Sequence, residues 1–151
     1  LVDVLLLFVD VLVLSLFGTA LSSLINYFLS SQGQISAVAS IVTAGYGFIC
    51  GAYMPISSFA SGLQKVLLFL PGTYGTSLVR NHSLSGVFAE MESQGIPTAV
   101  VDSLKASLDC SPKFFDWSVS IGMMYVILIV SIVVLLGTYI LINMLKKRRK
   151  K

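Results

Sequence analysis

The sequence predicts an all-α integral membrane protein with three transmembrane helices and an outer helical hairpin that re-enters the membrane. Two observations lead to this fold class. The 151 residues include only 10 Lys or Arg and 7 Asp or Glu, or 11% charged residues, and 56% are hydrophobic. An average soluble domain has roughly 25% charged residues. In addition, no charged residue occurs in Val11–Gln64 or in Trp117–Leu145. The composition therefore excludes an ordinary soluble globule, and it is too apolar for a disordered chain.

The first uncharged stretch is long enough for two spans, because one span needs about 20 apolar residues. Its most polar part, Ser30–Gln34, contains a glycine and predicts a turn. We therefore expect spans at about 4–29 and 35–54, the second closed by Pro55. The second uncharged stretch predicts a third span at about 120–143.

The orientation follows from the basic residues at the C-terminus, Lys146–Lys151. Without them the chain carries 4 basic and 7 acidic residues, a net charge of −3, so the overall +3 comes from this tail. A basic block directly after an apolar run is typical of a cytoplasmic membrane flank. It does not resemble a nucleic-acid-binding face, on which basic residues are spread out. We expect residues 55–119 to lie outside the cell membrane and the C-terminus to lie in the cytoplasm.

This topology places Leu1 outside, within an apolar run. Nothing before it would translocate it, so we expect earlier helices to precede this segment in a longer protein. The alternative is a signal peptide cleaved near Gly18–Ala20. Signal peptides begin with basic residues, whereas this chain has no Lys or Arg before Lys65 and carries Asp3 and Asp10.

The outer segment begins with an apolar run, Ser57–Leu70, in which Lys65 is the only charge. Runs of this length are too short to span and suit re-entrant or interfacial helices. Pro71-Gly72 predicts a sharp turn, and a second apolar piece, Thr73–Val79, follows it. Together they predict a re-entrant helical hairpin at about 57–81. Two further short helices are expected at 83–94 and 98–109.

The order of these parts resembles the C-terminal half of the permease subunit of type-2 ABC exporters. The resemblance rests on Gly51-Ala52-Tyr53-Met54-Pro55-Ile56 after a membrane helix, on Leu70-Pro71-Gly72-Thr73-Tyr74-Gly75 after an amphipathic segment, and on Arg80 before the last helix. It implies that residues 1–151 are the C-terminal half of one transmembrane domain, holding the fourth, fifth and sixth helices of a six-helix permease. It also implies an outer gate and turn formed by Pro55, Lys65, Pro71, Gly72, Tyr74 and Arg80.

The resemblance further implies partners and cofactors. A separate ATPase subunit or domain would bind ATP, and a second permease would complete a homodimer or heterodimer in the lipid bilayer. This chain itself would hold no cofactor and would not be an enzyme. It lacks the Gly-x-x-x-x-Gly-Lys-Ser/Thr phosphate loop and the His-Glu-x-x-His zinc motif. The cargo cannot be derived from these residues.

Small residues recur every three or four positions along the second span. In lipid, such residues let helix backbones approach closely. This row predicts either a subunit interface or packing within one bundle, and it consists of Ser40, Ala44, Gly47 and Gly51.

Asp10 lies within the first span, where a carboxylate is costly and usually faces a protein interior or a wet cavity. It either lines a substrate route, pairs with a missing helix or lies close to the outer surface. Arg80, Asn81 and His82 either contact anionic headgroups at the gate or form a polar rim. Cys50 and Cys110 are either paired or two separate thiols. Two other functions stay open: a membrane scaffold, and a membrane enzyme whose catalytic residues lie upstream.

Overall fold

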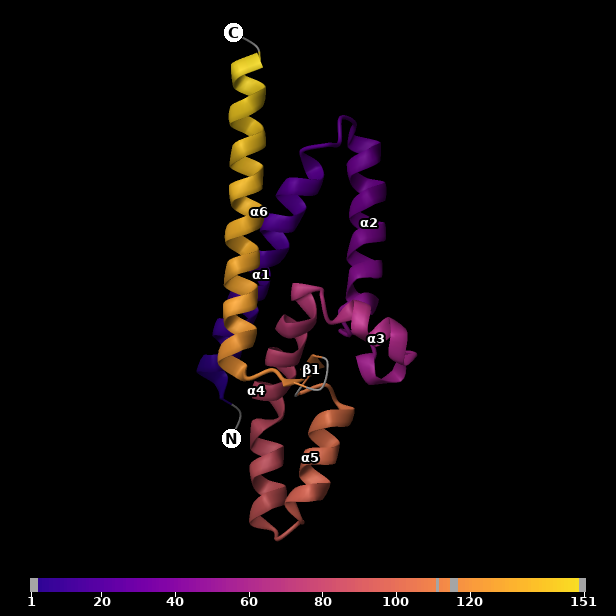
Figure 1. Cartoon of the computed structure of the whole chain (residues 1–151), viewed down its shortest axis with the longest axis vertical. Coiled ribbons are helices and arrows are strands. Elements are labelled where there is room, and N and C mark those ends of the chain that lie inside the picture. Colours follow the sequence, from indigo (N-terminus) through magenta and orange to yellow (C-terminus); the bar gives the residue numbers. More distant parts are fainter. Residues whose placement is uncertain (1–2, 111, 115–116, 150–151) are drawn as a thin grey trace.

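The structure is a computed structural model, and it describes residues 3–110, 112–114 and 117–149. Within them the fold is all-helical apart from one pair of two-residue strands (Figure 1). The elements are α1 (Val4–Asn26), α2 (Gln32–Ile49), the short 3₁₀ helix η1 (Ile56–Ser58), α3 (Ser61–Leu67), α4 (Pro71–Ser93), α5 (Thr98–Ser107), β1 (Lys113–Phe114), β2 (Trp117–Ser118) and α6 (Ile121–Arg149).

Two helices, α1 and α6 over Ile121–Lys147, are long and apolar enough to cross a membrane. In their most apolar windows only 17% and 6% of the residues are buried, respectively. A core helix of a soluble protein would be largely covered, so these exposed apolar surfaces favour lipid as their surroundings. The predicted spans at 4–29 and 120–143 correspond to these helices. The basic end of α6 continues the same helix, although Lys150 and Lys151 lie outside the described residues.

The predicted second span corresponds to α2, which is shorter than expected. Only α1 and α6 among the described helices are long and apolar enough to be candidate spans, so α2 is not confirmed as one. A break before α2 is present, but it lies at residues 27–31, earlier than predicted. Gln32, Gly33 and Gln34, expected in the turn, are the first residues of α2, and Ser31 and Gln34 form a capping box there. The backbone N–H of Gln34 donates to Ser31 Oγ over 3.3 Å, and the backbone N–H of Ser31 donates to the side-chain oxygen Oε1 of Gln34 over 3.3 Å. At the other end α2 stops at Ile49 instead of Met54. Gly51, with φ +78°, reverses the chain there, and the Ala52 amide donates to the Gly47 carbonyl over 2.8 Å.

The reversal before α4 also differs from the sequence prediction. The chain turns at residues 68–70, and Pro71 and Gly72 are the first two residues of α4. Proline suits the first position of a helix because that position needs no amide donor. The predicted second arm and the predicted helix at 83–94 are therefore one continuous helix of 23 residues. The first arm is also shorter than predicted, since α3 begins only at Ser61.

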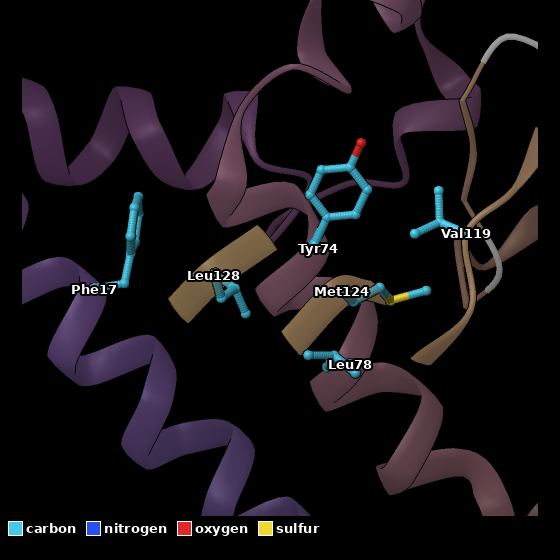
Figure 2. Packing of buried hydrophobic residues seen from close by; sticks show 6 residues of the cluster. All are labelled: Phe17, Tyr74, Leu78, Val119, Met124 and Leu128. Carbon is cyan, nitrogen blue, oxygen red and sulfur yellow. The ribbon is translucent and has the colours of Figure 1, made fainter. Parts of the chain in front are cut away.

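The core lies where α4 packs between α1 and α6. Figure 2 shows its six buried side chains: Phe17, Tyr74, Leu78, Val119, Met124 and Leu128. At Gly75 the helices are so close that a Cβ would lie 2.5 Å from Leu14 of α1 and 3.7 Å from Leu128 of α6. Leu128 is seven residues beyond the start of α6, which corresponds to about 10 Å along a helix axis. The first turns of α4 therefore lie alongside α1 and α6, inside the ends of these two helices.

The second half of α4 leaves these helices and forms a hairpin with α5 beyond their ends (Figure 1). A small second core, with Phe88, Val101 and Cys110 buried, holds this hairpin together. The α4–α5 hairpin buries apolar side chains and exposes polar ones, as the mixed composition of this part of the chain predicts. Its role in the fold is to anchor the exposed end of α4.

Candidate functional site

A polar cluster of three side chains joins α1, α4 and α6. Nδ1 of His82 lies 2.5 Å from Oδ2 of Asp10, and the Tyr125 hydroxyl donates a hydrogen bond to Oδ1 of the same carboxylate. The Asp10 side chain is 0% exposed and the His82 side chain 5% exposed. Both carboxylate oxygens are therefore engaged, and Asp10 of α1 is bonded to α4 through His82 and to α6 through Tyr125.

Helical periodicity explains why these residues meet. His82 follows the buried Leu78 by four positions on α4, and Asp10 precedes the buried Phe17 by seven on α1. Spacings of four and seven keep side chains on one face of a helix. The three polar groups thus lie in the same interface between α1, α4 and α6 that contains the apolar core, next to the core residues. They lie at the end of that interface nearest the α4–α5 hairpin, since Asp10 and Tyr125 are close to the starts of α1 and α6.

The sequence does not identify the partners of Asp10, and both sequence interpretations of His82, a gate or headgroup contact and a polar rim, differ from its buried position beside Asp10. Asp10 and His82 are 72 positions apart, so no local spacing connects them. The available signal was physical: a carboxylate within a span needs a partner, and His82 is the only histidine in the chain.

A second polar cluster fixes the loops around the start of α4. Nη1 of Arg80 lies 3.5 Å from Oδ2 of Asp109 and 3.3 Å from the Leu108 carbonyl oxygen. Nη2 of Arg80 donates a hydrogen bond to the Gly51 carbonyl oxygen. Asp109 in turn accepts hydrogen bonds from the amides of Ile56 and Ser57. Arg80, expected at the gate, therefore ties the end of α2, η1 and the end of α5 to α4.

Asp109 takes this position through a left-handed backbone conformation, with φ 54°. It is the residue after the C-cap of α5, and the Cys110 amide donates to the Lys105 carbonyl over 2.9 Å, as in a Schellman motif. Next to it, Asn81 Nδ2 donates to the Cys110 carbonyl over 3.0 Å. Burial raises the pKa of the Cys110 thiol. Cys50 and Cys110 are both free thiols.

The Pro-Gly-Thr-Tyr element closes the α3–α4 connection. Thr73 Oγ1 donates to the Leu67 carbonyl over 2.8 Å, and the Tyr74 hydroxyl donates to the Leu68 carbonyl over 2.6 Å. Both bonds satisfy carbonyls at the end of α3, which have no partner within that short helix. Gly72 is buried against α2, because a Cβ there would lie 2.7 Å from Cys50 Sγ. Gly72 thus serves a close contact instead of a turn.

The remaining predicted gate residues lie on the surface of the same region. Pro55 is half-buried and precedes η1, and Lys65 is exposed in the last turn of α3. Exposed apolar side chains lie near Lys65 in sequence, among them Val66 of α3, 61% exposed, and Phe69 just after α3, 66% exposed. Together they give this short segment an amphipathic surface.

The small-residue row of α2 divides into two parts. Ser40 and Ala44 are exposed. Gly47 is covered by the chain's own Tyr53, whose ring would lie 2.6 Å from a Cβ, and Gly51 is the left-handed residue that ends α2. Gly47 and Gly51 thus serve contacts and a turn within this chain. A contact with another subunit stays a prediction for Ser40 and Ala44.

An apolar groove of about 340 Å³ separates α1 from α2. Its walls come from Leu14 to Asn26 of α1 and from Val38 to Gly47 of α2, and its floor includes Gly72 and Thr76 of α4. Ser40 and Ala44 lie outside this lining, so the groove and the exposed small residues mark different faces of α2.

The described residues contain no group of three or more His, Cys, Asp or Glu side chains that would hold a metal ion. The Asp10 cluster contains a carboxylate, an imidazole and a phenol, which can hold and exchange protons. No family model, curated protein or solved structure matches this chain.

Proposed function

We propose that this chain is part of the permease of an ATP-driven ABC exporter, with α3 and the first half of α4 forming the outer gate of the translocation route. The proposal rests first on the order of parts: an apolar helix, a second helix ending at a glycine, a short amphipathic helix, a proline-started helix, and a last apolar helix with a basic end. That order is the one that the resemblance to type-2 ABC permeases implies.

The single observation that supports it best is the position of the first half of α4. Gly75 in this half is level with Leu128, about 10 Å from the start of α6. Gly75 and the buried Leu78 pack against α1 and α6, and Gly72 packs against the end of α2. The second half then leads out to the α5 hairpin. A helix that starts inside and leaves on the same side closes a path without crossing the bilayer.

The polar clusters suit such a gate. Backbone that is not part of a long helix is tolerated at membrane depth only where protein or a water-filled cavity covers it. Here Thr73, Tyr74 and Arg80 satisfy carbonyls at the ends of α3 and α2. The α3–α4 connection is therefore supplied with the partners that it needs inside an apolar region.

In this proposal ATP binds a partner ATPase at the cytoplasmic face, near the turn between α1 and α2 and the basic end of α6. A second permease copy or a related chain completes the route. The chain itself supplies part of the path and its outer closure. The cell membrane is the expected location.

The test is to purify the tagged chain from its native membranes in mild detergent and to identify the proteins that co-purify. The proposal predicts an ATPase with a phosphate-binding loop, and vanadate-sensitive ATP hydrolysis in the purified fraction. A matched preparation of an unrelated tagged membrane protein is the control. A fraction free of any ATPase would contradict the exporter and favour a scaffold, whereas enzymatic turnover without ATP would favour the membrane enzyme.

A further inference from the structure

The Asp10 cluster has a net charge that depends on how many protons it holds. With one acidic proton between the carboxylate and the imidazole, the pair is neutral in total, whichever of the two groups carries the proton. The two side chains are almost completely buried and lie 2.5 Å apart, so they share one buried site. The Tyr125 hydroxyl adds a donor but no charge.

We propose that Asp10, His82 and Tyr125 form a buried proton-binding site, and that a second proton taken up by this site releases α4 from α1 and α6. In the step, a proton from solution binds the Asp10 carboxylate while His82 is an imidazolium. The product is a carboxylic acid beside a cation, with a net charge of +1. No bond other than the O–H bond forms, and no other co-reactant is needed.

The reason for release is the cost of an unpaired buried charge. Breaking a buried ion pair by neutralising one member leaves the other charge without compensation, which strongly destabilises the closed packing. The least costly response is to hydrate the imidazolium, and this requires α4 to move away from the two apolar helices. The site lies within the first two turns of α1 and α6. A small movement of α4 would therefore bring the imidazolium to the ends of these helices, where water can hydrate it.

Within the described residues, no other charged side chain faces the cluster from the helices that build it. On α1 the other acid is Asp3, exposed before the first turn. On α4, Arg80 is engaged with Gly51, Leu108 and Asp109, and Glu90 and Glu92 lie exposed further along. On α6 the cations and the other tyrosine, Tyr139, lie toward the opposite end. The proton count of the Asp10–His82 pair therefore sets the local charge.

The inference rests on the proposed function only in one respect, namely that release of α4 opens the outer route. The site and its movement are properties of the chain alone. They can be measured without an ATPase and without a cargo, so failure of either idea leaves the other open to its own test.

The experiment places spin labels at two exposed positions, Val87 of α4 and Val130 of α6. The two buried native cysteines are replaced by alanine, and the labelled protein is reconstituted in lipid nanodiscs. Pulsed electron resonance then measures the distance between the labels at about pH 7.5 and about pH 3, which lie above and below the ordinary pKa values of His and Asp. The wild-type cluster predicts one distance at the higher pH and a second, longer distance at the lower pH.

Two cluster variants make the result specific. His82→Gln leaves a lone carboxylate, so the dependence should invert: the longer distance appears at the higher pH and disappears when Asp10 is protonated. Asp10→Asn combined with His82→Gln has no charge to gain or lose, so one distance should persist at both pH values. Glu92→Gln removes the carboxylate of an ion pair with Lys105, 3.6 Å long, on the α4–α5 hairpin, and it should behave like the wild type.

A wild-type distance that does not change with pH would overturn the proposal. So would a pH-dependent change that survives in the double cluster variant, since the proton would then bind elsewhere. The inverted response of His82→Gln distinguishes a charge effect from a general loss of packing, because poor packing would not improve on acidification.

Discussion

A Cβ atom at Gly72 would lie 2.7 Å from Cε1 of the Tyr46 ring and 2.9 Å from its hydroxyl. This contact seats the first turn of α4 against the last turn of α2. It explains why the glycine follows a proline that has a different role, since Pro71 only starts the helix. The two residues of the Pro-Gly pair should therefore respond differently to substitution.

The first prediction concerns this pair. Gly72→Ala should destabilise the protein by about 1–3 kcal/mol, which is typical of overpacking. Pro71→Ala should be nearly neutral, because alanine is also accepted at the first helical position. Thermal unfolding in detergent measures the stability of both variants. Equal effects of both changes would mean that the pair acts as a turn after all.

The second prediction concerns the anchor between Arg80 and Asp109. Arg80→Lys removes the planar fork that reaches both a carboxylate and two carbonyls, and it should cost about 1–3 kcal/mol. Asp109→Asn should cost less than Asp109→Ala, because asparagine tolerates positive φ and keeps an acceptor. Thermal unfolding of the three variants gives the order. If Asp109→Ala were as stable as Asp109→Asn, neither the left-handed conformation nor the hydrogen bonds to η1 would contribute.

The third prediction concerns the Cys110 thiol. Burial raises its pKa above the ordinary value of 9.0, so the folded protein keeps the thiol proton when the unfolded chain releases it. Stability should therefore decrease as the pH rises above about 9, and the decrease should be smaller in Cys110→Ala. Unfolding midpoints between pH 7 and pH 10 measure both slopes. Identical slopes would show that the thiol titrates alike in both states.

The fourth prediction concerns the glycines of α2. Gly51→Ala should cost about 1–2 kcal/mol, because its φ is left-handed. Gly47→Ala should cost less, because the exposed Tyr53 ring can swing away. Ala44→Leu, at an exposed position of the same row, tests the subunit interface without disturbing the fold. Loss of dimer crosslinking in Ala44→Leu, with unchanged unfolding, would place the interface there, whereas normal crosslinking would exclude a tight contact at Ala44.

The sequence predicted those parts of the fold that depend on local patterns. Length and apolar composition located α1 and α6, and the polar stretch Ser30–Gln34 indicated a break before α2, which the structure places a few residues earlier. The Pro-Gly pair was interpreted as a turn because proline suits both a turn and a first helical turn. The choice is decided by Tyr46 and Cys50, which are distant in sequence from Gly72.

The candidate site was predictable only in part. Asp10 stood out because a carboxylate is rare within an apolar run, yet its partners come from two other helices. Arg80 was noted for its place before the last helix, but its contacts with Gly51 and Asp109 depend on how three chain reversals meet. Tertiary packing brings such residues together, and no local spacing in the sequence records it.

The most direct test of the account is where α3 lies relative to the bilayer. Spin labels are placed singly at Val66 on the exposed face of α3 and at Ser103 on the exposed face of α5. Their relaxation is then measured in nanodiscs with oxygen, which concentrates in lipid, and with a water-soluble nickel chelate. An outer re-entrant gate predicts that oxygen dominates at Val66 and nickel at Ser103. Dominance of nickel at both positions would show that the α3–α4 hairpin lies in water, and it would contradict the gate.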